Sequence, residues 1–179
     1  MCTQAVDAVS YIVVAVFFEG VLVLLRDAGV RHVIVGGTAV ILHGVPRTTA
    51  DLDLVVDLDQ ANLRRLISVM NRLGYVPRAP VDAAALCDPE QRSAWIADKG
   101  MRAFTFCLPG HALADIDVLI DGPLEYAELA RRAERVDADG LVVHIAGLED
   151  LIRMKLAAAR AQDLADVDAL RRLLEDRNG

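Results

Sequence analysis

Aromatic residues and cysteines are scarce in this chain. Aromatic residues make up only 4% of the 179 residues although 54% are hydrophobic, so we expect a core built from Val, Leu, Ile and Ala. The three cysteines, Cys2, Cys87 and Cys107, form no C-x-x-C pair, which argues against a disulfide framework and against a zinc site. This use of cysteine is typical of a reducing compartment, so we expect a cytoplasmic protein.

Basic residues are also fewer than acidic residues. The formal net charge is −7 at pH 7, which argues against broad nucleic-acid binding because such binding needs a basic face. One specific RNA docked on a local basic cluster stays compatible with this charge. The basic clusters at 64–65, 131–135 and 171–172 are interpreted as solvated helix faces.

No long hydrophobic run is present. The apolar segment 11–18 is interrupted by Glu19, and no stretch reaches the 18 or more uncharged apolar residues of a membrane-spanning helix. No basic residue precedes Tyr11, as a signal peptide would require. We therefore expect a buried first helix and no association with a membrane.

The length fits one domain, residues 1–179, with a sizeable core. Hydrophobic periodicity and turn residues predict an α/β (α+β) fold, in which a mixed sheet is flanked by helices. Helices are expected at 7–28, 38–43, 59–73, 88–100, 147–160 and from Asp163 onward, and strands at 32–35, 51–57, 102–107, 114–120 and 141–145. Residues 147–179 are thus expected to be helical, and residues 1–16 are interpreted as an N-terminal extension or as the product of a start site assigned too early.

Two acidic residues open the second predicted strand. Side chains alternate along a strand, so Asp51 and Asp53 are expected to stand on one face, under about 7 Å apart. Neighbouring like charges destabilise a sheet, so this pair needs a positive partner. Two divalent cations, typically about 3.5–4 Å apart, fit that spacing. The upstream Gly36-Gly37 provides a turn where backbone amides can approach phosphates.

Residues 33–56 resemble the nucleotidyltransferase superfamily that includes DNA polymerase beta. In that superfamily a Gly-Gly or Gly-Ser turn precedes an Asp-x-Asp strand. The G-G-x-A element at 36–39 and the R-x-T-x-D-x-D element at 47–53 together are similar to its minimal bacterial branch, which includes abortive-infection (AbiEii-type) toxins and small antitoxin or resistance (MNT-like) nucleotidyltransferases. The resemblance implies a nucleotidyltransferase fold with a helical C-terminal part.

The resemblance also implies a third carboxylate on a neighbouring strand, just before a short hydrophobic pair. Asp117, followed by Val118-Leu119, fits that position, and Asp115, on the same side of the strand, is the reserve. An ordinary half-exposed hairpin strand is the alternative. Asp51, Asp53 and Asp117 are therefore the predicted catalytic residues and the ligands of two Mg²⁺ ions, with Mn²⁺ as a substitute.

Nucleotide binding is expected from the segment before the acidic strand. The backbone amides of Gly36, Gly37 and Thr38 would bind the β- and γ-phosphates. Arg47 would pair with a triphosphate oxygen, and Thr49 would orient the turn. The alternative for this last pair is a surface arginine and an ordinary first residue of a strand.

A lysine and an aspartate near the C-terminus complete the predicted site. AbiEii-type proteins have a Lys-x-x-Ala helix followed by an Asp-x-x-Asp element, which the chain matches with Lys155 and with Asp163 and Asp166. The resemblance implies that Lys155 holds the nucleotide and that Asp163 lies near it. The alternatives are a lysine that extends to the rim of the apolar helix face, and an N-cap with a first-turn acid.

The predicted activity is metal-dependent transfer of NMP from an NTP to a hydroxyl on RNA, protein or a small molecule. The favoured role is a toxin–antitoxin or phage-defence component, with tRNA or protein as acceptor and a cognate toxin or antitoxin as partner. An antibiotic-type adenylyltransferase and a catalytically inactive binding partner are the alternatives.

Overall fold

The computed structural model describes residues 8–111, 114–138 and 140–179. Helix α1 spans Ala8–Asp27, so the predicted first helix is confirmed from Ala8 onward. The predicted start at Asp7, and residues 1–7 of the predicted extension, lie outside the described residues. Within the described part of the chain, no helix combines the length and the apolar character needed to cross a membrane.

A seven-stranded mixed sheet forms the centre of the molecule, with the strand order β3-β4-β5-β2-β1-β7-β6. The strands are β1 His32–Ile34, β2 Asp51–Val56, β3 Val76–Pro77, β4 Ala103–Cys107, β5 Asp115–Leu119, β6 Glu134–Ala138 and β7 Leu141–Ile145. Two neighbouring pairs, β1 with β7 and β2 with β5, are parallel, and the other pairs are antiparallel. The predicted mixed sheet flanked by helices is confirmed.

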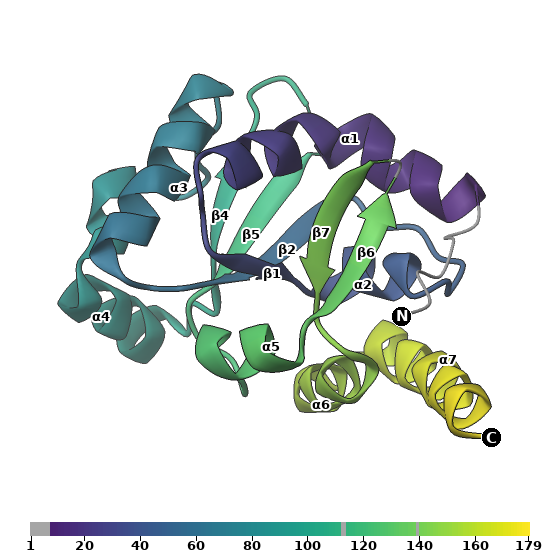
Figure 1. The fold of residues 1–179 in the computed structure, drawn as a ribbon. Coiled ribbons are helices and arrows are strands. Elements are labelled where there is room, and N and C mark those ends of the chain that lie inside the picture. Colours follow the sequence, from purple (N-terminus) through teal and green to yellow (C-terminus); the bar gives the residue numbers. More distant parts are fainter. Residues whose placement is uncertain (1–7, 112–113, 139) are drawn as a thin grey trace.

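Helices lie on both sides of this sheet. They are α2 Gly36–Leu42, α3 Gln60–Arg72, α4 Pro89–Lys99, α5 Tyr126–Arg132, α6 Leu148–Ala158 and α7 Ala161–Asn178, with a 3₁₀ turn η1 at Ala83–Cys87. Figure 1 shows α1 and α3 along one side, and α5, α6 and α7 along the other. In this view the α6–α7 pair therefore lies on the opposite side of the sheet from α1 and α3.

Alternation along the central strands separates a core face from a polar face. In β5 the residues Ile116 and Val118 are fully buried, while their neighbours Asp115 and Asp117 are partly exposed. Trp95 of α4 packs on Phe104 of β4 with ring centroids 5.5 Å apart, so this helix packs on the core face of the strand. The strands therefore present apolar side chains to the core and carboxylates to the opposite face.

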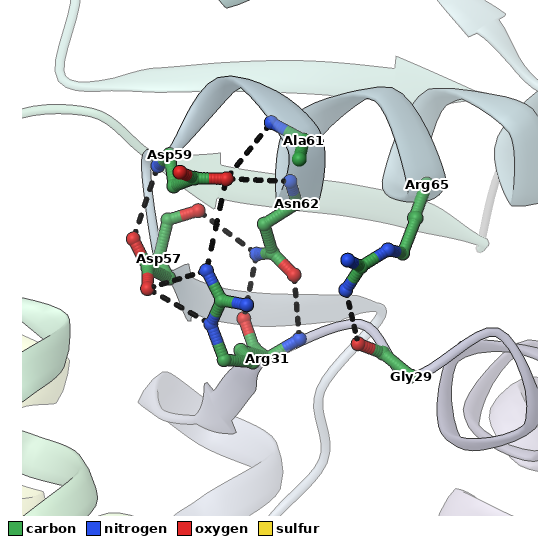
Figure 2. Close-up of polar contacts among 7 residues, drawn as sticks. All are labelled: Gly29, Arg31, Asp57, Asp59, Ala61, Asn62 and Arg65. Carbon is green, nitrogen blue, oxygen red and sulfur yellow. Dashed lines mark hydrogen bonds and ion pairs between the residues drawn. The ribbon is translucent and has the colours of Figure 1, made fainter.

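A polar network fixes the far end of β2 (Figure 2). The buried Asn62 accepts a hydrogen bond from the backbone N–H of Arg31 at 2.8 Å and donates to the carbonyl oxygens of Arg31 and Asp57. Asp59 caps α3 by accepting from the amides of Ala61 and Asn62, as its place before an apolar periodic segment predicts. This network ties β1, β2 and α3 together and sets the register of the acidic strand.

Three predictions of local structure are wrong. The basic cluster at 131–135, interpreted as a solvated helix face, is helical only as far as Arg132, and Arg135 lies in the edge strand β6, which pairs along its length with β7. Asp163 does not cap the last helix, which begins at Ala161, and it lies in the first turn instead. Apolar periodicity along this helix predicts that Leu164, Val167, Leu170 and Leu174 point inward. Leu164 is instead 47% exposed, whereas Val167 and Leu170 are buried.

Candidate active site

A cavity of about 320 Å³ lies where β2 and β5 begin. Its walls come from the β1–α2 junction, the first residues of β2 and β5, and helices α6 and α7. Nine of the ten residues predicted for the site line it: Gly36, Gly37, Arg47, Thr49, Asp51, Asp53, Asp117, Lys155 and Asp163. Segments more than 100 residues apart in the sequence therefore meet at one concave site.

Four carboxylates stand on the polar face of two adjacent parallel strands. The register places Asp51 beside Asp115 and Asp53 beside Asp117. On the next strand, Thr105 lies opposite Asp117 and donates a hydrogen bond from Oγ1 to the Asp117 carboxylate at 2.6 Å. The sheet thus concentrates negative charge at the floor of the cavity and fixes the orientation of one of the four carboxylates.

Crowding of these carboxylates changes their acidity. Burial, together with the charges of Asp117 and Asp51, raises the pKa of Asp53 to about 6, although the Gly37 amide and Lys155 oppose the change. Burial and the charges of Asp117 and Asp115 likewise raise the pKa of Asp51. Because both shifts reflect unfavourable negative charge, a bound cation would relieve them.

The carboxylates suit a hard divalent cation. Among the described residues, no three His, Cys, Asp or Glu side chains converge closely enough to hold one metal ion as they stand. Mg²⁺, however, is usually bound by one or two carboxylates together with substrate phosphates and water. Asp51 and Asp53, side by side at the floor of a cavity large enough for phosphate groups, fit that mode of binding.

Gly36 closes one side of this acidic floor. Its φ angle is +60°, a left-handed conformation, and a Cβ atom added there would lie 1.8 Å from Oδ2 of Asp53. Only glycine allows the backbone to pass so close to this carboxylate. The adjacent Gly37 has a similar role, since an added Cβ would lie 2.7 Å from Oγ1 of Thr49.

We expect Gly36→Ala to displace Asp53 and to reduce nucleotide transfer strongly. Gly29 is a matched control, because its φ angle is +65° and nothing lies within 4 Å of an added Cβ. Alanine in the left-handed region costs about 1–2 kcal/mol at either position. Chemical denaturation should therefore show a similar loss of unfolding free energy in both variants. Transfer that falls equally in both variants would contradict a specific contact between Gly36 and Asp53.

Positive charge lines the wall provided by α6 and α7. Lys155 is buried and its Nζ contacts Asp163 at 3.3 Å and Asp166 at 2.6 Å. Arg47, from the loop before β2, also pairs with Asp166, and Arg160 contacts Asp163 at 2.7 Å. The alternative in which Lys155 extends to the solvent-exposed rim is therefore wrong, because two aspartates hold its ammonium group inside the protein.

These cations also determine the acidity of Asp163. Burial alone would raise its pKa, but hydrogen bonds from Arg160 and Lys155 and their charges keep the pKa below its ordinary value. Asp163 therefore stays ionised at neutral pH. The wall carries three cations and two anions, and its excess positive charge faces the acidic floor.

Two predicted residues hold the backbone. Thr38 is fully buried, does not line the cavity, and donates from Oγ1 to the carbonyl oxygen of Asp51 at 3.1 Å. Thr49 approaches the same carbonyl oxygen at 3.5 Å. Both hydroxyls thus fix the start of β2, and the Thr49 contact agrees with the predicted role of orienting the turn.

Asp115 lies beside the cavity rather than in its lining. One of its carboxylate oxygens pairs with Arg78, whose side chain is 57% exposed, and the buried Oδ1 has no hydrogen-bond partner. Asp117, in contrast, lines the cavity. This difference favours Asp117 as the third carboxylate of the site, in agreement with the predicted order of preference.

Sequence reasoning missed three participants. Asp166 matches the Asp-x-x-Asp element, with a first-turn acid as the alternative, but no contact of its own is predicted for it, whereas it connects Lys155 with Arg47. Arg160 and Thr105 were not singled out, although each contacts a predicted site residue. The Asp-x-x-Asp spacing was the available signal for Asp166, but neither Arg160 nor Thr105 stands in a distinctive motif.

A family model covers most of the chain. Residues 14–174 match the model of a family described as "Nucleotidyltransferase of unknown function (DUF6036)". None of the curated protein sequences matches the chain.

Several solved structures share the fold at low sequence identity. The lincomycin-bound lincosamide antibiotic adenylyltransferase LnuA has a TM-score of 0.59 at 13% identity, covering 95% of this chain and 99% of that one. The antibiotic-resistance factor ANT(2'')-Ia gives a TM-score of 0.53 at 13% identity, with 92% of each chain covered. An antigenic nucleotidyltransferase-like protein from Paracoccidioides brasiliensis gives 0.54 at 18% identity, covering 90% of this chain and 74% of that one.

Proposed function

The chain belongs to this nucleotidyltransferase family, and we propose that it transfers NMP from an NTP to a hydroxyl group in a metal-dependent reaction. One observation carries the proposal: the acidic floor at Asp51, Asp53 and Asp117 faces the cationic wall at Lys155 and Arg47 across one cavity. The floor suits divalent cations and the wall suits phosphate oxygens. The negative charge of a triphosphate bound between them would be neutralised by the divalent cations on the floor and by the basic side chains of the wall.

Each group has a distinct part in the proposed reaction. Lys155 and Arg47 bind triphosphate oxygens, and Gly36 and Gly37 let the phosphates approach the backbone. The acceptor oxygen attacks the α-phosphorus, the bond to the leaving pyrophosphate breaks, and the acceptor proton passes to the carboxylate of Asp117. Asp51 and Asp53 would hold Mg²⁺, which supplies charge neutralisation on the attacking and leaving oxygens.

For the biological role, we propose a toxin–antitoxin or phage-defence component that modifies tRNA or a protein and works with a cognate partner. The second candidate is an antibiotic-type adenylyltransferase. Two solved structures with this fold are an antibiotic adenylyltransferase and an antibiotic-resistance factor. The net charge of −7 and the row of four carboxylates also favour a small or cationic acceptor over a long polyanion.

Incubation with each α-³²P-labelled NTP should identify both substrates. With Mg²⁺ and a mixture of total tRNA, cell lysate and lincomycin, we expect label from one NTP to appear in one class of acceptor. Label in tRNA or protein supports the defence role, and label in lincomycin supports the second candidate. Removal of divalent ions with EDTA should abolish labelling, and added Mg²⁺ or Mn²⁺ should restore it. Labelling that survives EDTA would contradict metal dependence, and no labelling with any NTP would favour the inactive binding partner.

A further inference from the structure

One buried carboxylate joins the two cations of the cavity wall. Asp166 lies on α7, its side chain is 5% exposed, and its Oδ2 contacts both Nζ of Lys155 and Nη1 of Arg47. Asp166 itself does not line the cavity, whereas both of its partners do. Its effect on a ligand would therefore be transmitted through those two side chains.

The contacts of Asp166 leave the cations able to bind a ligand. The ammonium group of Lys155 has three N–H donors, of which Asp163 and Asp166 occupy two. The guanidinium group of Arg47 has five, and the contacts recorded for it, to Thr48 and Asp166, use two. Both cations are thus fixed in direction while they keep donors for phosphate oxygens.

Asp166 also connects parts of the chain that are far apart in the sequence. Arg47 comes from the loop before β2, 119 residues away, and Lys155 comes from α6. Without Asp166, the buried Lys155 would keep only Asp163 as an anionic partner, and the partly buried Arg47 would lose its ion pair at the wall of the cavity. Each would then turn toward another partner or toward solvent.

We infer that Asp166 is a positioning residue for the triphosphate, which sets Lys155 and Arg47 at the spacing that binds adjacent phosphate groups. This inference rests on the proposed function. A stabilising ion pair without influence on the ligand is the competing explanation, and the chain contains a suitable comparison. Asp150 on α6 is also buried, at 3% exposed, and also pairs with two arginines, Arg132 at 2.8 Å and Arg153 at 3.6 Å, but it lies outside the cavity.

Calorimetric titration with inorganic tripolyphosphate and Mg²⁺ tests the inference without knowledge of the base. We expect Asp166→Asn to weaken tripolyphosphate binding by about tenfold or more, which corresponds to about 1.4 kcal/mol or more. Asp150→Asn should leave binding within about twofold of the wild type, although both variants lose a buried ion pair and should melt at lower temperature. Equal weakening in both variants, or unchanged or tighter binding in Asp166→Asn, would overturn the inference.

Two further variants separate position from charge. Asp166→Glu keeps the negative charge but moves the carboxylate by one methylene group. If Asp166 acts by positioning its partners, this variant should bind tripolyphosphate more weakly. If only its charge matters, the affinity should stay unchanged. This variant also serves if Asp166→Asn fails to fold. In a Lys155→Met/Arg47→Met background, addition of Asp166→Asn should change affinity by less than about twofold, because its partners are gone. A wild-type protein that binds no tripolyphosphate would overturn the proposed function as well, whereas binding unaffected by either Asp166 variant overturns this inference alone.

Discussion

Asp53→Asn should be more stable than the wild type at neutral pH and almost inactive in nucleotide transfer. Burial and the charges of Asp117 and Asp51 raise the pKa of Asp53 from 3.8 to about 6 in the folded protein. At pH 7.5 the ionised carboxylate therefore costs about 3 kcal/mol of stability in the absence of metal. Asparagine removes that charge and keeps an oxygen that can accept from the Gly37 amide.

The free energy of unfolding of the wild type should change with pH in a definite direction. The folded wild type binds a proton at Asp53 at higher pH than the unfolded chain does, so its free energy of unfolding should rise as pH falls from about 6 toward 3.8. In Asp53→Asn that rise should be smaller, because only the contribution of Asp51, whose pKa is also raised, remains. Chemical denaturation in EDTA at pH 7.5 and pH 5 would measure both effects.

Asp57, just beyond the end of the same strand, is a control whose pKa is shifted in the opposite direction (Figure 2). A hydrogen bond from the Asp59 amide, followed by contacts with Arg31, lowers the pKa of Asp57. Its ionised form therefore stabilises the fold above its usual pKa, and that contribution is lost as pH falls through the lowered value. Asp57→Asn should consequently lose stability at pH 7.5. If both asparagine variants lose stability there, the crowding of charge at Asp53 is not the dominant effect.

Transfer by Asp53→Asn should fall by about 10³-fold or more. Charge stabilisation by a bound metal contributes several kcal/mol to such reactions, and each 1.36 kcal/mol is a factor of ten. A variant that is more stable but inactive would show that the carboxylate is kept for ligand binding at the expense of the fold. Transfer near the wild-type rate would contradict the role of Asp53 in metal binding.

Local signals were strong enough to predict β5, which carries part of the acidic floor, and several of the elements around it. Asp59 before an apolar periodic segment predicted α3, and Asp88-Pro89 with Gly100 predicted both ends of α4. Alternation of apolar and polar residues predicted β4 and β5. Each of these signals depends on side chains within a few residues, so a single sequence is sufficient to read it.

Elements and contacts without a strong local sequence pattern were missed. The edge strand β6 has the sequence Glu-Arg-Val-Asp-Ala, which is too polar to stand out, and it forms because β7 supplies its hydrogen bonds. β3 has only two residues, and one of them is proline. Asp166 was missed as a site residue for the same reason, because its partner Arg47 is 119 residues away and no local pattern indicates their contact.

A pair of asparagine variants should decide which carboxylate of β5 acts in the reaction. Asp117 lines the cavity, lies beside Asp53 and accepts a hydrogen bond from Thr105 at 2.6 Å. We expect Asp117→Asn to bind Mg-NTP with nearly wild-type affinity, because Asp51, Asp53 and the cationic wall remain. Its transfer rate should fall by about 10²–10⁴-fold, the usual loss when a general base is removed.

Asp115→Asn is the matched control, two residues away on the same face of the same strand. Asp115 lies outside the cavity lining and is paired with Arg78, so we expect its loss to slow transfer by less than about tenfold. The two variants are compared by measuring their turnover rates and by titrating each with nucleotide. An inactive Asp115 variant beside a nearly normal Asp117 variant would transfer the role to Asp115, whose buried Oδ1 has no hydrogen-bond partner in the structure. Equal and mild losses in both would remove β5 from the reaction and leave its carboxylates as the polar face of an ordinary sheet.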